Sequence, residues 1–378
     1  MWQVQSQPNS SSLISMSASD NTPKSNLDIR PQLADWLQQQ LQLEEKPELM
    51  PLGGDAGFRC YFRLAGQPKM DGGNLIAVYA PPEVEKNHEF VAVAEKLKEI
   101  SVNTPTIHAK NLDLGFFLLE DFGNEHLFDI LAKDNVLALY GRSSQLLINM
   151  QMTDNSIALP QYDESVLQRE MDLLQQWFLP ELLGYQLSAE ESAMLANCYQ
   201  LLLESATGQT QRLVHRDFHS RNIMLANEEL ALIDFQDAVW GPITYDLVSL
   251  LRDCYVYWPN EIVQQALQQH WGEMPESLRA NLSFEEFECD FDLMGLQRHI
   301  KVLGIFARLA LRDKKHAYLN DLPLVIRYTV EVAEKYPQFA AFADWFKRKI
   351  IPLCESQSWY VDFRHAGEQG AHLSRAAL

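Results

Sequence analysis

The most constraining feature of this chain is a polar loop between short apolar runs, from residue 213 to residue 237. It reads Leu213-Val-His-Arg-Asp-Phe-His-Ser-Arg-Asn-Ile-Met-Leu225, and Leu232-Ile-Asp-Phe-Gln-Asp237 follows. The apolar runs predict buried strands. Asp217, Asn222 and Asp234 therefore fall at strand ends or in the loop, and their two carboxylates and one carboxamide supply oxygen atoms of the kind that bind Mg²⁺.

The spacing of these three residues indicates phosphoryl transfer from ATP. Such a reaction needs an acceptor for the proton of the substrate hydroxyl and oxygen ligands for magnesium on the phosphates. We therefore expect Asp217 to be the catalytic base, and Asn222 and Asp234 to bind magnesium. An aspartate that only capped a turn would not require the other two residues at this spacing.

Three other polar residues of the loop are expected to support it or to contact the substrate. His215 and Arg216 are expected to be structural and to form hydrogen bonds within the loop. His219 lies near the expected acceptor hydroxyl, and both substrate contact and loop packing remain open for it.

Length and charge restrict the class of protein. A chain of 378 residues exceeds one ordinary domain, so two lobes are expected. With 31 Lys+Arg against 51 Asp+Glu, the net charge of −20 repels nucleic acid and anionic lipid. We therefore expect neither as a partner. The sequence specifies no oligomeric state.

Cysteine usage and the first residues bear on the cellular compartment. Five dispersed cysteines without a CxxC pair favour reduced thiols and a cytoplasmic location. Residues 1–27 are rich in Ser, Asn and Gln and resemble a flexible tail more than a secretory signal. Met16 could be the true start, in which case residues 1–15 would not belong to the native protein. No apolar stretch is long enough to span a membrane.

Residues 28–119 show the pattern of a small β-rich lobe. Asp28 is expected to cap a helix with Pro31 in its first turn. Strands are expected at 49–52, 58–64, 75–79, 106–108 and 116–119, with a turn at 66–73 and a helix at 85–100. The glycines Gly53, Gly54 and Gly57 lie between two strands, where a loop could cover ATP phosphates with its backbone amides.

Residues 120–350 are mostly helical apart from the strand-rich segment 212–236. Helices are expected near 125–152, 163–178, 189–206, 243–253, 260–270, 284–312, 321–336 and 338–349. The predicted fold class is α+β with two lobes and a cleft between them. We assign nucleotide binding to 28–119, catalysis and acceptor binding to 120–350, and a C-terminal extension to 351–378.

The motifs together resemble the aminoglycoside phosphotransferase and choline kinase branch of the protein-kinase-like fold. That branch usually carries His-Gly-Asp-x-x-x-x-Asn, then Ile-Asp-Phe or Ile-Asp-Trp, then Gly-Asp-Pro-x-x-Tyr-Asp-Leu. This chain carries His215-Arg-Asp-Phe-His-Ser-Arg-Asn222, Ile233-Asp-Phe235 and Gly241-Pro-Ile-Thr-Tyr-Asp-Leu247. The resemblance covers roughly residues 30–350. It implies that Asp246 is structural and braces the catalytic loop.

A narrower resemblance is to the bacterial kinases that phosphorylate N-acetylmuramate and N-acetylglucosamine at C1 during cell-wall recycling. It rests on Tyr245-Asp-Leu-Val-Ser-Leu-Leu-Arg-Asp-Cys-Tyr-Val-Tyr-Trp258 and on Phe291-Asp-Leu-Met-Gly-Leu-Gln-Arg-His-Ile-Lys-Val-Leu-Gly304. Helical spacing places Arg298 and Lys301 on one side of the second segment. Arg298 is a candidate for the carboxylate of an acidic sugar. A solvated face or internal ion pairs remain the alternative.

The N-terminal part departs from the family pattern. The third strand lacks the expected lysine, because Ile76-Ala-Val-Tyr79 places tyrosine near that position. Arg59 or Lys86 could supply the missing cation, and Glu89 is a weak candidate for its carboxylate partner. Glu120 and Asp121 correspond to the hinge between the lobes, where backbone groups would bind adenine. An acidic turn that closes a strand is the alternative for these two residues.

These observations predict a cytoplasmic kinase that uses ATP and Mg²⁺ to phosphorylate a small molecule. The preferred acceptor is the anomeric hydroxyl of an N-acetylated amino sugar. An aminoglycoside, choline or homoserine-type acceptor is the second possibility, and a nucleotide-binding pseudokinase is the third. A protein kinase is disfavoured, because Asp234 lies too close to Asp246 for a long activation loop.

Overall fold

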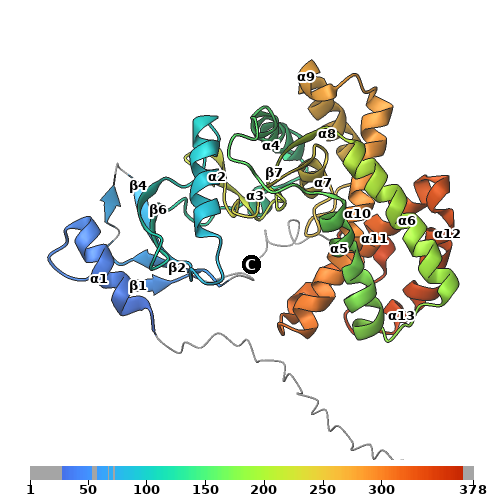
Figure 1. Ribbon diagram of the computed structural model, residues 1–378, viewed down its shortest axis with the longest axis horizontal. Helices are drawn as coiled ribbons and strands as arrows, with labels where there is room; N and C mark the ends of the chain where they lie inside the picture. Colours follow the sequence, from blue (N-terminus) through green and yellow to red (C-terminus); the bar gives the residue numbers. More distant parts are fainter. Residues whose placement is uncertain (1–27, 53–57, 67, 71–72, 369–378) are drawn as a thin grey trace, which may run out of the picture.

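The computed structural model describes residues 28–52, 58–66, 68–70 and 73–368, which form two unequal lobes (Figure 1). The smaller lobe, blue to cyan in the figure, is built on a sheet, and the larger lobe, green to red, is mostly helical. The predicted two-lobed α+β fold is confirmed. No helix within the described residues is long and apolar enough to cross a membrane.

The smaller lobe contains one six-stranded antiparallel sheet. Its strands are β1 (Leu49–Pro51), β2 (Cys60–Leu64), β3 (Lys69–Met70), β4 (Gly73–Tyr79), β5 (Ile107–Asn111) and β6 (Phe116–Glu120). They lie in the order β1-β2-β4-β6-β5, and β3 pairs with β4 beside this path. All five predicted strands are present, and β3 lies in the segment predicted as a turn.

Two helices cover opposite faces of this sheet. Successive side chains of a strand point to opposite faces, so Ala77 of β4 packs toward α1 (Arg30–Leu41) and Val78 packs toward α2 (Asn87–Glu99). Phe90 of α2 joins the second group and belongs to the same core as the large lobe. The α2 face of the sheet is therefore the face that adjoins the catalytic half.

Asp28 contacts the start of α1, but the N-cap residue is Ile29, so the prediction that Asp28 caps the helix is wrong. Its carboxylate accepts a hydrogen bond from the Arg30 backbone N–H at 3.1 Å and pairs with the Arg30 guanidinium. Pro31 lies in the first turn, where its missing N–H has no intrahelical partner to lose.

The larger lobe contains helices in all eight predicted regions. They are α3 (Leu127–Ile130), α4 (Val136–Gln151), α5 (Glu164–Leu173), the π-helical η1 (Leu174–Leu182), α6 (Ala189–Gly208), α7 (Tyr245–Leu251), α8 (Asn260–Glu273), α9 (Glu276–Arg279), α10 (Phe284–Leu311), η2 (His316–Asp321), α11 (Leu322–Lys335), η3 (Pro337–Phe339), α12 (Ala340–Trp345), η4 (Phe346–Ile350), α13 (Ile351–Glu355) and η5 (Phe363–His365).

The prediction of one helix over 125–152 is wrong, because the chain breaks between α3 and α4. Asn135 accepts a hydrogen bond from the Ala132 N–H at 2.8 Å and donates one to the Ile130 carbonyl at 2.8 Å. A side chain that satisfies the backbone in this way stabilises the turn in place of a continuous helix.

α10 is the central helix of the large lobe and packs against α5, α6, α7, α11 and η1. It starts with a capping box in which Ser283 and Glu286 each satisfy the other's backbone N–H. Gly304 lies against the backbone of Leu173, where a Cβ atom would come within 2.3 Å of the Leu173 carbonyl carbon. Glycine is therefore required for the close approach of α10 to α5.

Two small antiparallel ribbons hold the polar loop identified in the sequence. β7 (Gln211–Val214) pairs with β10 (Val239–Pro242), and β8 (Ile223–Ala226) pairs with β9 (Glu229–Leu232). The strand-rich segment predicted at 212–236 is confirmed. β10 follows it and was not predicted, since Gly241 and Pro242 are unusual in a strand.

Candidate active site

The catalytic-loop candidates lie between β7 and β8, on the side of the large lobe that adjoins α2. Within this loop the His219 N–H donates to the Asp217 carbonyl at 2.9 Å, and the Asn222 N–H donates to the His219 carbonyl at 2.9 Å. The Ile233 N–H donates to the Asn222 carbonyl at 3.1 Å. These bonds bring Asp234, the next residue, beside the end of the loop.

The Asn222 side chain is oriented by the loop itself. Its amide nitrogen donates to the Asp217 carbonyl at 3.0 Å, which leaves the amide oxygen as the atom that could bind a metal. Asp234 has a left-handed backbone with φ of 65°. This conformation is rare for residues other than glycine and tends to occur at functional sites.

Asp246, in the first turn of α7, contacts the backbone at the start of the catalytic loop. Its two carboxylate oxygens accept the His215 N–H at 2.6 Å and the Arg216 N–H at 3.0 Å. Burial raises the pKa of Asp246 to about 7, although both N–H donors favour the ionised form. These are the hydrogen bonds that a residue bracing the loop would make.

His215 is fully buried and held from both ring nitrogens. The Asp217 N–H donates to its Nδ1 at 3.3 Å, so the other nitrogen carries the proton and donates to the Ile233 carbonyl at 3.1 Å. Burial lowers the pKa of His215 to about 4. The neutral ring therefore joins the catalytic loop to the strand end that carries Asp234.

The charges around Asp217 keep it ionised. Burial opposes its ionisation, but the positive charges of His219, Lys301 and Arg216 outweigh this effect, and the pKa of Asp217 lies below its ordinary value. Burial also lowers the pKa of His219, so Lys301 and Arg216 are the lasting cations at neutral pH. The pKa of Asp234 is raised, mainly by burial and also by the Asp217 charge.

Asn222 and Asp234 suit a magnesium ion that is shared with phosphate. The described residues contain no group of three or more His, Cys, Asp or Glu side chains that could hold a metal by themselves. Mg²⁺ commonly takes one or two protein ligands and completes its shell with phosphate oxygens and water. One amide oxygen and one carboxylate therefore fit a metal that arrives with a nucleotide.

Arg216 and Lys301 share a carboxylate that the sequence did not reveal. Glu170 of α5 pairs with Arg216 at 2.5 Å and with Lys301 at 3.0 Å. Lys301 also donates to the Tyr245 hydroxyl at 2.8 Å. Burial opposes the Glu170 charge, yet Lys301 and Arg216 hold the pKa of Glu170 below its ordinary value. No local pattern around Glu170 distinguishes it from a surface acid.

The α10 segment that contains Arg298 and Lys301 is buried, so the alternative of a solvated face is wrong. Lys301 forms an internal ion pair with Glu170, whereas Arg298 forms none with any described residue. Arg298 is 5% exposed and its Nη1 donates to the Cys254 thiol at 3.2 Å. Among the described residues its Nε has no hydrogen-bond partner, which is unusual for a buried guanidinium.

His219 lies at the same end of the site. Its ring meets Tyr255 edge-on with the centroids 5.3 Å apart, and Arg221 lies 3.7 Å from the Tyr255 centroid. The His219 Nδ1 is buried and makes no hydrogen bond to any described residue. His219 therefore packs against Tyr255, outside the loop, and its Nδ1 has no partner among the described residues.

On the N-lobe side, Gly53, Gly54 and Gly57 lie outside the described residues. Tyr79 does not lie on the α2 face, because it packs on the α1 face with its ring 5.9 Å from that of Phe116. Val78 occupies the α2 face at this point in place of a lysine.

Arg59 reaches the α2 face from the neighbouring strand. It pairs with Glu85 at 3.0 Å, and Glu89 is exposed and makes no such pair. The proposed partner Glu89 is therefore wrong.

Glu120 and Asp121 follow β6 at the junction of the lobes. The Glu120 N–H donates to the Thr106 carbonyl and the Asp121 N–H to the Asn74 carbonyl, both at 2.9 Å. The Asp121 carboxylate binds Arg63 at 2.6 Å. Both backbone donors are thus engaged, and an adenine bound here would need other backbone groups of the hinge.

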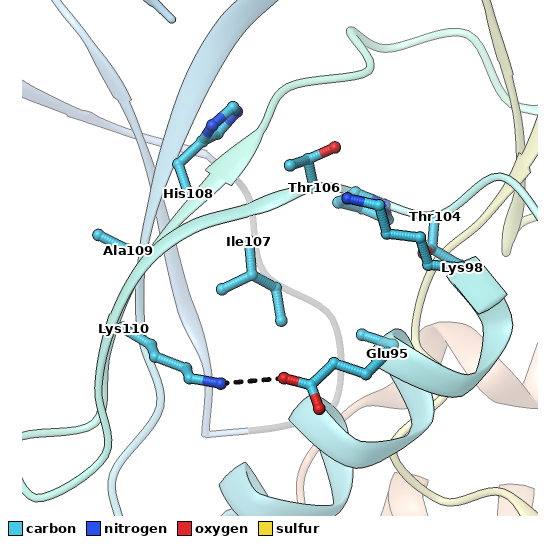
Figure 2. A pocket seen from close by; sticks show the side chains of 10 residues that line it. Glu95, Lys98, Thr104, Thr106, Ile107, His108, Ala109 and Lys110 are labelled. Atoms are coloured by element: carbon cyan, nitrogen blue, oxygen red, sulfur yellow. Dashed lines mark hydrogen bonds and ion pairs between the residues drawn. The ribbon is translucent and has the colours of Figure 1, made fainter. Parts of the chain in front are cut away.

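A cavity of about 390 Å³ lies between α2 and β5 (Figure 2). Lys98 and Glu95 approach it from α2, and Lys110 of β5 pairs with Glu95 at 3.2 Å. None of the described residues that line it belongs to the catalytic loop. This cavity is therefore separate from the candidate catalytic residues at 215–234.

Comparisons with known proteins show a family and a fold. A model of the phosphotransferase enzyme family matches residues 48–280. The chain is 40% identical over 298 residues to N-acetylmuramate/N-acetylglucosamine kinase of Pseudomonas aeruginosa. The aligned region covers 79% of this chain and 87% of that protein. It is 37% identical over 323 residues to the kinase of the same name from Pseudomonas putida, over 83% of this chain and 94% of that protein.

A solved structure shows the same fold at lower identity. ADP-bound aminoglycoside phosphotransferase APH(2'')-Ib aligns with a TM-score of 0.55 and 16% identity, over 81% of this chain and 99% of that chain. At this identity the similarity supports the fold alone.

Proposed function

Because this chain belongs to the phosphotransferase enzyme family, we propose that it transfers a phosphoryl group from ATP to the C1 hydroxyl of N-acetylmuramate or N-acetylglucosamine. The observation that carries this proposal is the 40% identity to a kinase named for both sugars, over most of each chain. Both sugars arise from peptidoglycan, so the reaction would serve cell-wall recycling.

The catalytic loop supports the proposed chemistry. Asp217, kept ionised by Lys301 and Arg216, would accept the proton of the C1 hydroxyl. The sugar oxygen would then form a bond to the γ-phosphorus while the bond to the ADP oxygen breaks. An anomeric hydroxyl is more acidic than an ordinary alcohol, which suits a carboxylate base. Mg²⁺ bound by Asn222 and Asp234 would neutralise charge on the phosphates.

The two sugars differ by the lactyl carboxylate of N-acetylmuramate, and Arg298 is our candidate for binding it. Its guanidinium is buried without a carboxylate partner among the described residues, and its Nε donates no hydrogen bond. A charge-assisted bond to a substrate carboxylate would satisfy that donor. His219, with its unpaired Nδ1, is the candidate for a sugar hydroxyl or amide.

A panel of acceptors tests this proposal. Purified protein is incubated with MgATP and, separately, N-acetylmuramate, N-acetylglucosamine, an aminoglycoside, choline and homoserine, and ADP release is measured. We expect turnover with the two amino sugars. Turnover only with the aminoglycoside, choline or homoserine would show that the acceptor is not an N-acetylated amino sugar. MgATP binding without turnover on any acceptor would favour a nucleotide-binding pseudokinase.

A further inference from the structure

We propose that Arg59 is the N-lobe cation that binds the phosphates of the nucleoside triphosphate, in place of the lysine missing from β4. The inference rests on the proposed use of ATP and assigns one residue of that site. It follows from where Arg59 lies in the sheet, what holds it, and how it connects to Asp234.

The position of Arg59 follows from the register of the sheet. Tyr61 of β2 pairs with Val78 of β4. Arg59 precedes Tyr61 by two residues and therefore lies on the same α2 face, next to the position that Val78 fills. A small cavity of about 20 Å³ lies there, and of the described residues that line it Arg59 alone carries a charge.

The Arg59 side chain is held in a fixed position. Only 8% of it is exposed, and its Nε donates to the Glu85 carboxylate at 3.0 Å. Its guanidinium carbon lies 4.9 Å from the ring centroid of Phe90. Glu85 also accepts the Phe58 N–H at 3.2 Å. A buried cation paired with a carboxylate beside α2 provides what the strand lysine and helix glutamate provide in kinases.

A hydrogen-bonded chain connects Arg59 to Asp234. The Arg59 Nη1 donates to the side-chain Oε1 of Gln236 at 2.9 Å, and the side-chain Nε2 of Gln236 donates to the Asp234 carboxylate at 2.7 Å. Phe235, between these residues, stacks on Phe90 with the centroids 5.0 Å apart and the planes within 7°. Arg59 is therefore positioned against the metal-binding aspartate from across the lobes.

One nitrogen of the Arg59 guanidinium remains for a ligand. Its Nη2 is buried and has no hydrogen-bond partner among the described residues. A buried donor without a partner is costly, and a phosphate oxygen beside Asp234 would satisfy it. Because Nε and Nη1 of Arg59 are already held by hydrogen bonds, the guanidinium would lose little conformational entropy when Nη2 binds that oxygen.

Lys86, the other candidate cation, lies differently. It pairs with Asp237 at 2.6 Å, and the two side chains are 53% and 40% exposed. An exposed ion pair of this kind contributes little to stability. Lys86 forms no ion pair with Asp234 among the described contacts. Lys86→Ala is therefore the matched comparison for loss of a lobe-bridging cation, and Arg348→Ala, at an exposed helix position, is the control for loss of a surface cation.

The test measures nucleotide binding without an acceptor, by displacement of a fluorescent ATP analogue with MgATP, magnesium-free ATP or adenosine. In Arg59→Met we expect MgATP to bind roughly 10- to 100-fold more weakly, with adenosine changed less than about twofold. Arg59→Lys should recover part of the loss. Lys86→Ala and Arg348→Ala should both stay within about twofold of wild type.

Two outcomes would overturn the assignment. If Arg59→Met weakens the binding of adenosine and of MgATP equally, Arg59 only stabilises the contact between the lobes. If Lys86→Ala weakens MgATP binding more than Arg59→Met does, Lys86 is the phosphate-binding cation. If Arg59→Met fails to fold, Arg59→Lys carries the same comparison. Arg59-dependent MgATP binding without transfer to either amino sugar would refute the proposed acceptor and leave the assignment of Arg59 intact.

Discussion

Asp246 offers a direct way to separate loop geometry from overall stability. The substitution Asp246→Asn keeps the size of the side chain and exchanges one carboxylate oxygen for an NH₂ group. In the folded chain both oxygens accept backbone N–H groups, from His215 at 2.6 Å and from Arg216 at 3.0 Å. The variant can accept only one of them and brings a donor against the other.

The expected magnitude follows from these two contacts. Leaving one buried N–H unsatisfied costs about 1–3 kcal/mol, and this cost acts on the loop that carries Asp217. Displacement of the loop in most molecules would lower kcat by roughly 10- to 100-fold, since about 1.4 kcal/mol is a factor of ten. The melting temperature should fall by only a few degrees for a chain of this size.

Steady-state kinetics and thermal melts on the same preparations provide the assay. Asp290→Asn is the control, because Asp290 accepts a bond from Ser205 at 3.2 Å and does not contact the loop. We expect the control to retain kcat within about twofold. Wild-type kcat in Asp246→Asn, together with a loss of stability equal to that of the control, would contradict a role of Asp246 in holding the catalytic loop.

Two further predictions concern the acceptor and the effect of acid. Arg298→Met should raise KM for N-acetylmuramate roughly 10- to 100-fold and leave N-acetylglucosamine within about threefold; equal losses for both sugars in initial-rate assays would contradict carboxylate binding. Burial lowers the pKa of His270 from 6.5 to about 3, so its neutral ring stabilises the fold above about pH 6.5 and this contribution is lost as the pH falls toward 3. Between pH 7 and pH 5 the free energy of unfolding should fall by roughly 2 kcal/mol because of His270. Urea unfolding should therefore show a smaller pH dependence in His270→Gln than in wild type, and an unchanged dependence would contradict this role of His270.

The parts predicted correctly from the sequence are those fixed by short stretches of chain. The strands of the N-lobe follow from short apolar runs bounded by turn residues, and α10 (Phe284–Leu311) matches the helix expected near 284–312. The catalytic loop was visible because Asp217 and Asn222 lie within one turn-rich segment, and phosphoryl transfer sets their spacing. The predicted helix over 125–152 failed because Asn135 makes hydrogen bonds to the backbone that interrupt it.

The parts that were missed depend on contacts between distant residues. Glu170 lies 46 residues before Arg216, and Glu85 lies 26 residues after Arg59. Neither pair has a local signature, since an isolated acid on a helix or loop is usually solvated. The wrong choice of Glu89 shows the difficulty, because helical position alone favoured it and the folded chain uses Glu85.

The sheet also explains why the strand lysine could not be placed from sequence. The prediction aligned Tyr79 with it, but a shift of one residue reverses the face on which a side chain lies. Tyr79 packs toward α1 and Val78 toward α2. Only the pairing of Tyr61 with Val78 shows that Arg59 reaches the same face from the adjacent strand.

The most direct test of the proposed function is the position of the phosphate in the product. Wild-type protein and Asp217→Asn are incubated with MgATP and N-acetylmuramate, and the product is examined by phosphorus and proton nuclear magnetic resonance. We expect wild type to give a C1 phosphate, and Asp217→Asn to fold normally and lose transfer by roughly 10³-fold or more. Phosphate at C6, or wild-type turnover in Asp217→Asn, would contradict the account.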